Sequence, residues 1–450
     1  MLWQPSLPEH YLKMSPDDLT REIEDRRRRL GDSLVILGHH YQTDEVIQHA
    51  DFTGDSLKLS QLAAEVARTR PVKHVIFCGV HFMAESADML TPENVEVILP
   101  DLSAGCSMAD MAQYDDTCQA WDAIHATLRE GGWQGQVIPI TYVNSSAAIK
   151  AFVGANGGAC CTSSNAAMVF DWAMRGGDNN AENMNADERH AALGNAEFSD
   201  VNDLRETPPA NGEDVNTRAV IDALGSRDDV KILFLPDQHL GRNTAAKHGI
   251  DVAHASCVYD PRRARAGEPL GGASAGEILR SRVILWAGHC SVHKLFRPEH
   301  CDQVRAEDAQ HPDREPTRIL VHPECAKEVV DKADLAGSTE FIISTIRSAP
   351  PGSRWAVGTE VHLVTRIARE AAERGVSVRI LSDCQCLCTT MYRIDQPHLL
   401  WVLDNLCGVG TKDGTPRVVN AIRVHPEVRS LALKALDRML GLSPAHVAKD

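Results

Sequence analysis

Three kinds of feature are scarce in this chain, and each scarcity excludes a class of protein. Aromatic residues make up only 5% of it, which argues against a nucleic-acid binder that stacks bases on aromatic side chains. The formal net charge is −16, whereas proteins that read nucleic acids need a basic face. No apolar run approaches the length of a membrane span. We therefore expect neither a nucleic-acid partner nor a membrane partner.

The beginning of the chain also lacks a targeting signal. "MLWQPSLPEHYLKMSPDDL" has no basic stretch followed by an apolar one, so we expect no signal peptide and a cytoplasmic protein. Thiols stay reduced in the cytoplasm, and an odd number of cysteines, thirteen, then favours metal or redox chemistry over a disulfide framework. For most of these cysteines, burial as small hydrophobic side chains is the simpler interpretation.

What the sequence does contain is typical of a globular enzyme. Hydrophobic residues make up 43% and charged residues 24% of a chain long enough for two to four domains. Short β-branched runs such as "SLVILGHHY", "HVIFCGV", "QVIPITYVN", "VKILFLP" and "TRILVHPE" alternate with helix-like segments. Several runs are continuously apolar, as expected of parallel strands buried on both faces. The sequence therefore predicts an α/β fold.

Three segments of the chain repeat one plan. In each, a strand ends in polar residues, a turn of small residues with Ser or Thr follows, and a cysteine comes after two more strands. The strand-end residues are His39 and Tyr41, Tyr142 and Asn144, and His322 and Glu324. The turns contain Ser56, Ser163, Ser338 and Thr339, and the cysteines are Cys106, Cys290 and Cys388.

The spacing within the repeats predicts the domain organisation. Ser56 to Cys106 and Ser338 to Cys388 both span 50 residues, whereas Ser163 to Cys290 spans 127. The middle copy therefore holds inserted stretches near 173–218, which is acidic and rich in Asn, and near 259–280. We expect a helical extension at 1–30, α/β repeats at 31–118, 119–312 and 313–410, and a helical segment at 411–450.

Ligands of open α/β sheets bind at the carboxyl ends of the strands. Three homologous three-layer α/β/α domains with parallel sheets, arranged around a pseudo-threefold axis, would bring the polar residues and one cysteine from each copy to a common centre. Three thiolates suit a 4Fe–4S cluster with one iron left without a protein ligand. A zinc ion with three cysteines and water or histidine is the alternative. Cys384 and Cys386 are spare in this arrangement.

The motifs also resemble those of a known family. "GHHYQTDEVIQHADFTGDS", "AGCSMADM", "ITYVNSSAAIKA", "LPDQHLGRN", "GHCSVHKLF", "HPEC" and "CLCTTMYRID" resemble quinolinate synthase motifs, in the family's order, over about residues 30–410 apart from the inserted stretches. The resemblance implies three α/β domains and an oxygen-sensitive 4Fe–4S cluster held by Cys106, Cys290 and Cys388. It also implies condensation of iminoaspartate with dihydroxyacetone phosphate to quinolinate for NAD synthesis, with loss of phosphate and two waters. Thr389 stands where many members have proline, and Cys386 is the alternative third ligand.

The chemistry assigns roles to the repeated residues. Glu324 with His322 is the expected acid–base pair, assisted by Tyr142 and His39; the alternative for Glu324 is a first-turn carboxylate favoured by a helix dipole. By resemblance, all six strand-end residues line the substrate pocket: His39, Tyr41, Tyr142, Asn144, His322 and Glu324. The carboxylates and the phosphate are expected to bind at helix starts, through Ser56, Ser163, Ser338 and Thr339. By resemblance, Thr359 also lines the pocket.

Some interpretations stay open at this point. The serines and threonines in the turns can also be simple helix caps. His293 and Lys294 either supply positive charge near the cluster or begin a solvated helix. The rival functions are a different iron–sulfur hydro-lyase and an iron–sulfur redox sensor, although no basic helix–turn–helix stretch supports the sensor. The acidic stretch near 173–218 is a candidate contact for L-aspartate oxidase, the enzyme that makes unstable iminoaspartate.

Overall fold

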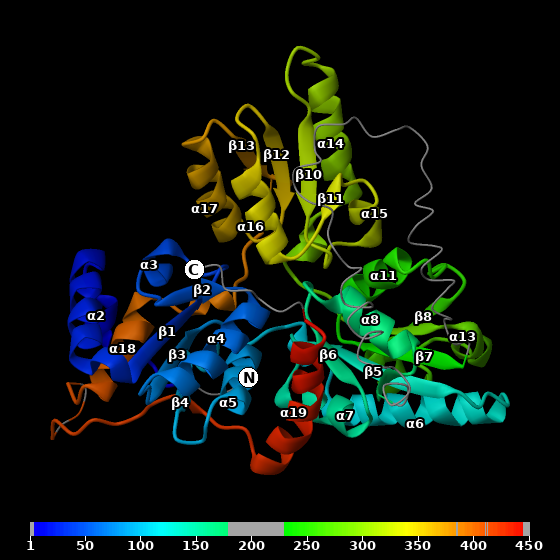
Figure 1. Ribbon diagram of the computed structural model, residues 1–450, viewed down its shortest axis with the longest axis horizontal. Coiled ribbons are helices and arrows are strands. Elements are labelled where there is room, and N and C mark those ends of the chain that lie inside the picture. The colour runs from blue at the N-terminus through cyan, green and yellow to red at the C-terminus, as the bar shows by residue number, and fades with distance from the viewer. Residues whose placement is uncertain (1–3, 179–228, 384–385, 410, 412, 444–450) are drawn as a thin grey trace.

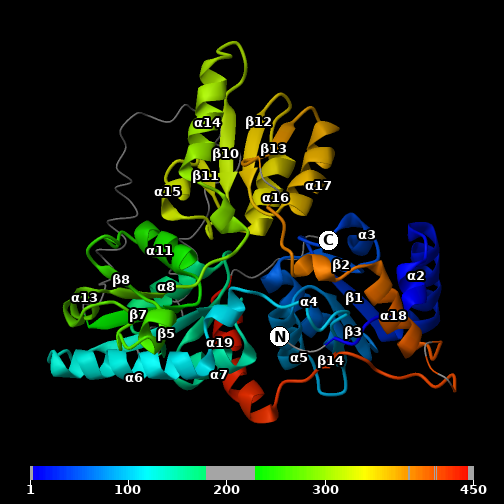
Figure 2. The ribbon, with the colours of Figure 1, turned by 180° about the vertical axis from the view of Figure 1, so that it is seen from behind.

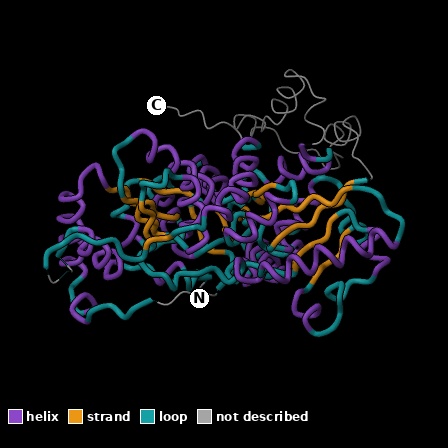
Figure 3. Tube along the Cα trace, turned by 90° about the horizontal axis from the view of Figure 1, so that it is seen from below, coloured by secondary structure: helices purple, strands orange, loops and turns teal. Residues whose placement is uncertain are grey.

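The structure, a computed structural model, describes residues 4–178, 229–383, 386–409, 411 and 413–443. Three sheets, each built mainly of parallel strands, form three lobes around a common centre (Figure 1; Figure 2 shows the same lobes from behind). Helices lie on either side of the strands, as the view from below shows (Figure 3). The predicted α/β fold of three related three-layer units is confirmed.

The first lobe follows two N-terminal helices. Its sheet contains β1 (Leu34–His39), β2 (Phe52–Gly54), β3 (His74–Cys78) and β4 (Glu96–Ile98). The helices before and around it are α1 (Glu9–Leu12), α2 (Pro16–Leu30), α3 (Asp44–Ile47), α4 (Ser56–Thr69) and α5 (His81–Leu90). Every residue of β1 is buried, which explains the uninterrupted apolar run in its sequence.

The second lobe is the largest. Its strands are β5 (Gln136–Tyr142), β6 (Ala159–Cys161), β7 (Val230–Leu235), β8 (Ser256–Tyr259) and β9 (Val283–Trp286). Its helices are α6 (Tyr114–Glu130), α7 (Ala147–Ala155), α8 (Ala166–Met174), α11 (Gln238–Lys247), α12 (Pro261–Arg265) and α13 (Ala275–Arg280). The predicted insertion near 259–280 thus contains two helices, whereas most of the one near 173–218 lies outside the described residues.

The third lobe begins with helix α14 (Pro298–Ala309), which packs on β10 (Thr317–Val321). Its other strands are β11 (Leu335–Ala336), β12 (Arg354–Gly358) and β13 (Ser377–Ile380). Its further helices are α15 (Lys327–Val330), α16 (Thr339–Ser348) and α17 (Val361–Ala372). The chain then returns to the first two lobes through α18 (Gln396–Leu406), β14 (Ala421–Ile422) and α19 (Pro426–Gly441).

The strand order shows the relationship among the lobes. The three sheets share the orders β2-β1-β3-β4, β6-β5-β7-β9 and β11-β10-β12-β13, with parallel pairing throughout. Two edge strands depart from the pattern: β8 extends the second sheet in parallel, and β14 pairs antiparallel with β4. The domain boundaries stay a prediction. The C-terminal segment adds β14 to the first sheet and packs α19 on the second lobe.

The C-terminal helix fastens the second lobe from outside. α19 packs along α7, and Gly154 permits this approach because a Cβ there would collide with the carbonyl oxygen of Leu431. Asn165 at the start of α8 donates hydrogen bonds to the carbonyl of Met439 (3.1 Å) and to the hydroxyl of Ser443 (2.9 Å). Among the described residues, no helix has the length and apolar character that crossing a membrane requires.

Candidate active site

One pocket lies where the carboxyl ends of the three sheets meet. Its lining comes from all three lobes and includes twelve of the predicted site residues: His39, Tyr41, Ser56, Cys106, Tyr142, Asn144, Ser163, Cys290, His322, Glu324, Thr339 and Cys388. Parallel strands in each sheet end at the same edge, so residues far apart in the sequence converge there. Ser338 and Thr359 are not among the lining residues, and their positions are described below.

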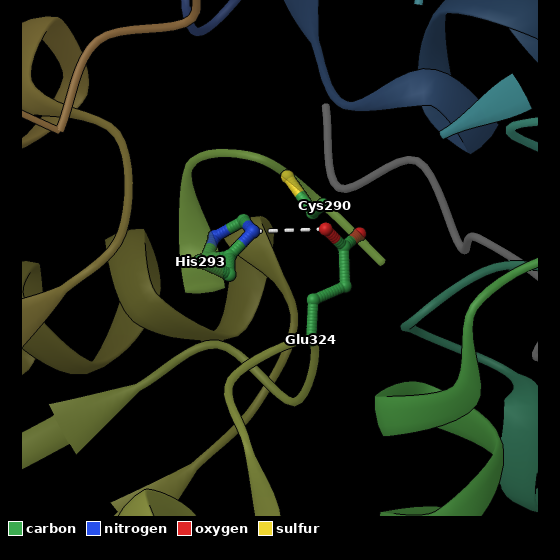
Figure 4. Close-up of side chains that lie close together, drawn as sticks. All are labelled: Cys290, His293 and Glu324. Carbon is green, nitrogen blue, oxygen red and sulfur yellow. Dashed lines mark hydrogen bonds and ion pairs between the residues drawn. The ribbon is translucent and has the colours of Figure 1, made fainter. Parts of the chain in front are cut away.

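Glu324 is held by partners on both of its carboxylate oxygens. The hydroxyl of Tyr142 donates to Oε1 at 2.5 Å. Nδ1 of His293 lies 2.8 Å from Oε2, and Figure 4 shows this contact as a dashed line. Burial alone would raise the pKa of Glu324, but the neighbouring His293 and the two hydrogen bonds hold that pKa well below its usual range. Glu324 is therefore an ionised carboxylate although its side chain is buried.

The hydrogen-bonded chain continues to the opposite wall. Nε2 of His293 lies 3.2 Å from Oγ1 of Thr359, which lies 2.9 Å from the hydroxyl of Tyr41. The Tyr41 hydroxyl also lies 3.3 Å from Oγ1 of Thr339. A single path of hydrogen bonds thus connects Tyr142 of the second lobe, through the third lobe, to Tyr41 of the first. Thr359 acts within this path, behind the lining residues.

Two strand-end histidines occupy equivalent positions in two lobes. Nδ1 of His39 accepts a hydrogen bond from the amide of Tyr41 (3.1 Å), and Nδ1 of His322 accepts one from the amide of Glu324 (3.3 Å). Because Nδ1 is an acceptor, the proton of each neutral ring is on Nε2, which His322 directs at Oγ of Ser163 (3.2 Å). Burial lowers the pKa of both histidines to about 3, so both rings are neutral near pH 7.

The three cysteines share one local structure. Each lies three residues before a short 3₁₀ helix: η2 (Ala109–Met111), η5 (His293–Leu295) and η6 (Met391–Arg393). The carbonyls of Cys106, Cys290 and Cys388 each accept a hydrogen bond from the amide four residues later, at 3.0, 3.1 and 3.0 Å. The same turn therefore presents one thiol from each lobe to the pocket.

Cys386 has a different environment from Cys388. Its side chain is fully buried in a hydrophobic cluster of the third lobe, and its sulfur lies 3.2 Å from Oγ of Ser382. Cys388, in contrast, lines the pocket. Cys384 lies outside the described residues.

The thiols are close enough to affect one another. Burial raises the pKa of Cys106 to about 12, and the nearby Cys388 and Glu324 add to this rise. Burial raises the pKa of Cys290 well above its usual range, with Glu324, Cys388 and Cys106 adding to it. Because a thiol binds a metal only as a thiolate, a metal bound by these cysteines would displace their thiol protons. The donor set, three thiols from three directions, fits a metal–sulfur centre.

A second group of metal-ligating side chains shares one of these cysteines. Ligand atoms of Cys290, His293 and Glu324 all lie within 4.8 Å of one another, and Figure 4 shows the three side chains converging. His293 and Glu324 already hydrogen-bond each other, so this group is as well suited to proton transfer as to metal binding.

The serines and threonines lie at helix starts. α4 begins at Ser56 and α16 at Thr339, so both helix N-termini face the pocket. Ser338 caps α16 by accepting a hydrogen bond from the amide of Phe341. Among the described residues that line the pocket, none is arginine or lysine. Any anion bound there would depend on helix N-termini, hydroxyls and amides.

The loop that carries His39 and Tyr41 is fastened by the third lobe. From α17, Arg366 donates to the carbonyls of His40 (2.9 Å) and Gln42 (2.6 Å) and pairs with Asp44 (2.7 Å). On the far side of the loop, Nε2 of His40 lies 2.9 Å from a carboxylate oxygen of Glu340. The conformation of this first-lobe loop therefore depends on the third lobe.

Sequence reasoning missed several features of the site. It read His293 either as a source of positive charge or as the start of a solvated helix, whereas His293 is buried and connects Glu324 to Thr359. The Lys294 side chain is exposed and lies beside His289, and Glu360 caps α17. Asp237 carries a fully buried carboxylate oxygen without a hydrogen-bond partner, and Asn144 has an amide oxygen in the same condition. The spacing Cys290–His293 was the one available signal for the histidine.

The fold and the pocket define a three-lobed α/β protein with one central site lined by thiols and acid–base side chains. Comparison with known sequences gives the family. Residues 21–181 and 214–441 match the family model described as "Quinolinate synthetase A protein", so the chain belongs to the quinolinate synthetase A family.

Curated relatives cover nearly the whole chain. A protein named quinolinate synthase from Acidobacterium capsulatum is 46% identical over 432 residues, which is 96% of this chain and 95% of the relative. Proteins of the same name from a Nocardioides species (46% identical, 94% of this chain, 88% of the relative) and Streptomyces coelicolor (42%, 95% and 89%) are similar as well.

Proposed function

We propose that this chain is a quinolinate synthase, a transferase that condenses iminoaspartate with dihydroxyacetone phosphate to quinolinate in de novo NAD biosynthesis, releasing phosphate and two waters. The observation that carries the proposal is the meeting of three lobes at one pocket, where each lobe contributes a thiol on the same turn. Family membership and the names of the relatives support it.

The cofactor in this proposal is one 4Fe–4S cluster held by Cys106, Cys290 and Cys388. The shared turn geometry and the exposure of Cys388 to the pocket support Cys388 over Cys386 as the third ligand. When bound, the cluster supplies Lewis acidity at the iron that has no protein ligand.

The protein's own residues handle protons and anions. Glu324, ionised, accepts a proton from the substrate at its carboxylate. Tyr142 holds one oxygen of that carboxylate and His293 holds the other. His322, assisted by His39, donates a hydrogen bond from the Nε2–H of its neutral ring, which stabilises negative charge as it develops on the substrate. The chain from Glu324 through His293 and Thr359 gives the proton a path to Tyr41.

Binding of the two substrates is assigned to the helix starts. Ser56, Ser163, Ser338 and Thr339 with the N-termini of α4 and α16 hold carboxylates and phosphate, Ser338 acting through the cap of α16, and Asn144 and Tyr41 complete the pocket. A cytoplasmic location and a transient contact with L-aspartate oxidase belong to the same proposal.

The test is an assay of the protein purified without oxygen. Iminoaspartate, generated in place from aspartate, and dihydroxyacetone phosphate should give quinolinate, and about four irons and four sulfides per chain should be present. Omitting dihydroxyacetone phosphate should abolish the product, whereas a simple hydro-lyase would not need it. The variant E324Q should lose most of the activity and keep its iron. Zinc without sulfide, or no quinolinate from the iron-loaded chain, would overturn the proposal.

A further inference from the structure

Asn243 lies on α11 of the second lobe and reaches into the third. Its side chain is only 3% exposed. Its amide nitrogen donates two hydrogen bonds, to the carbonyl oxygen of Pro323 (2.9 Å) and to that of Cys325 (2.9 Å). These two residues immediately precede and follow Glu324. One side chain therefore holds the backbone on both sides of the carboxylate at the centre of the site.

The residue type matches this task closely. A primary amide carries two hydrogens on one planar nitrogen, so it can satisfy two carbonyls at once, which a hydroxyl with one hydrogen or a carboxylate with none cannot do. Asparagine is also unfavourable within a helix compared with alanine or leucine, because its side chain competes for backbone hydrogen bonds. A buried asparagine inside α11 therefore calls for a specific contact, and the Pro323 and Cys325 carbonyls are that contact.

The two carbonyls belong to a short turn without helical or strand hydrogen bonding around Glu324. Within the turn, the amide of Glu324 bonds His322 Nδ1 at 3.3 Å and the amide of Cys325 bonds the His322 carbonyl at 3.0 Å. Asn243 is the cross-lobe support for the same turn. Its helix is anchored in the second lobe directly after β7, by a cap in which Asp237 accepts hydrogen bonds from the amides of His239 and Leu240.

We propose that Asn243 is a positioning residue for Glu324, and the inference rests on the function proposed above. By fixing the peptide groups on both sides, Asn243 keeps the Glu324 carboxylate within reach of Tyr142 and of the reacting atoms. A displacement of about 1 Å in a catalytic group can cost about 100-fold in rate, so a backbone anchor of this kind affects turnover more than substrate binding. Asn243 itself touches no substrate.

The experiment replaces Asn243 by leucine, which keeps the approximate size and removes both donors. The matched control is N405L, because Asn405 is also a buried helical asparagine whose amide bonds a carbonyl, that of Trp401, and it lies outside the pocket. N243L should lower kcat between about 10- and 100-fold with KM within about twofold of wild type. Iron and sulfide content should equal that of wild type, and N405L should keep its kcat.

A second measurement does not depend on activity. Amide hydrogen exchange of the holoprotein should be faster in peptides covering 320–327 of N243L than of N405L, while exchange in β12 stays the same. N243A, which also removes both donors, should behave like N243L in both measurements, and it serves if N243L does not fold.

The outcomes separate this inference from the proposed function. Equal kcat and equal exchange at 320–327 in N243L and N405L overturn it, and so does a loss of kcat that accompanies loss of iron. If wild type makes no quinolinate, the proposed function fails, and faster exchange confined to 320–327 would still support Asn243 as the anchor of this turn.

Discussion

The hydroxyl of Tyr142 and the carboxylate of Glu324 share a 2.5 Å hydrogen bond although 182 residues separate them in the chain. Tyr142 ends β5 of the second lobe, and Glu324 follows β10 of the third. Both side chains are buried, and a hydrogen bond to an ionised acceptor is stronger than one between neutral groups. The bond thus ties two lobes together at the residue on which the proposed chemistry depends.

Changing Tyr142 to phenylalanine removes this donor and leaves the ring. The Glu324 carboxylate would then be buried with one oxygen unpartnered, so we expect kcat for quinolinate formation to fall at least about 10-fold. The unsatisfied carboxylate should also reduce the free energy of unfolding by about 1–3 kcal/mol. Y259F is the matched control, because Tyr259 is a buried tyrosine stacked on Trp286 outside the pocket. Equal kcat in the two variants would contradict the role given to Tyr142.

The third ligand can be identified from iron content. C388A should lose the iron and sulfide, because Cys388 occupies the position equivalent to Cys106 and Cys290. C386A should keep both, because that sulfur lies in the hydrophobic cluster of the third lobe. Iron and labile sulfide are measured on protein purified without oxygen. Loss of iron in C386A with retention in C388A would reverse the assignment.

Arg366 should control how well the His39–Tyr41 loop is formed. R366M removes the donors to the carbonyls of His40 and Gln42, so the loop becomes less ordered. A smaller fraction of the molecules then has the loop in the conformation that binds substrate. We expect KM to rise about tenfold, which corresponds to about 1.4 kcal/mol, with a smaller change in kcat. R347M is the control, because Arg347 pairs with Glu370 on the surface. An unchanged KM in R366M would show that the loop holds its shape without the third lobe.

Stability should fall on mild acidification because of the buried histidines. Burial lowers the pKa of His39 to about 3, so between about pH 6.5 and pH 3 the unfolded chain binds a proton that the folded chain does not. The part of the unfolding free energy that depends on His39 staying neutral is therefore fully present above the unfolded-state pKa, and it is lost as the pH falls below that value. H39Q removes the titrating group. Between pH 7.5 and 5.5 it should lose about 1.4 kcal/mol less unfolding free energy than wild type. Parallel denaturation curves at the two pH values provide the measurement, and an equal loss in both proteins would contradict it.

The sequence allowed the main architecture and much of the pocket lining to be predicted. Runs such as that of β1 are apolar at every position because the strand is buried on both faces, which is a property of the residues themselves. Parallel pairing then forces the residues after the strands to one edge, so His39, Tyr142 and Glu324 could be grouped before any coordinates were known.

The remaining features depend on contacts between lobes. The link from His293 to Thr359 and the anchor from Asn243 require side-chain directions that no local pattern encodes. β14 is two residues long and comes from a segment predicted to be helical; it pairs with β4 because an edge is free there, so its existence depends on tertiary context. β8, a second edge strand that the sequence analysis did not predict, pairs in parallel with β9.

The order in which the thiols occur along the chain has a consequence for how the protein is made. Cys106 follows β4, Cys290 follows β9, and Cys388 comes only after β13, near the end of the third lobe. During synthesis the first two thiols leave the ribosome long before the third, and until Cys388 emerges the pocket lacks its third thiol. A centre held by all three thiols can therefore be captured only by an almost finished chain. Under the proposed function, loading of the cluster would therefore be the closing event of maturation, and a prematurely terminated chain would lack the complete set of thiols that holds it.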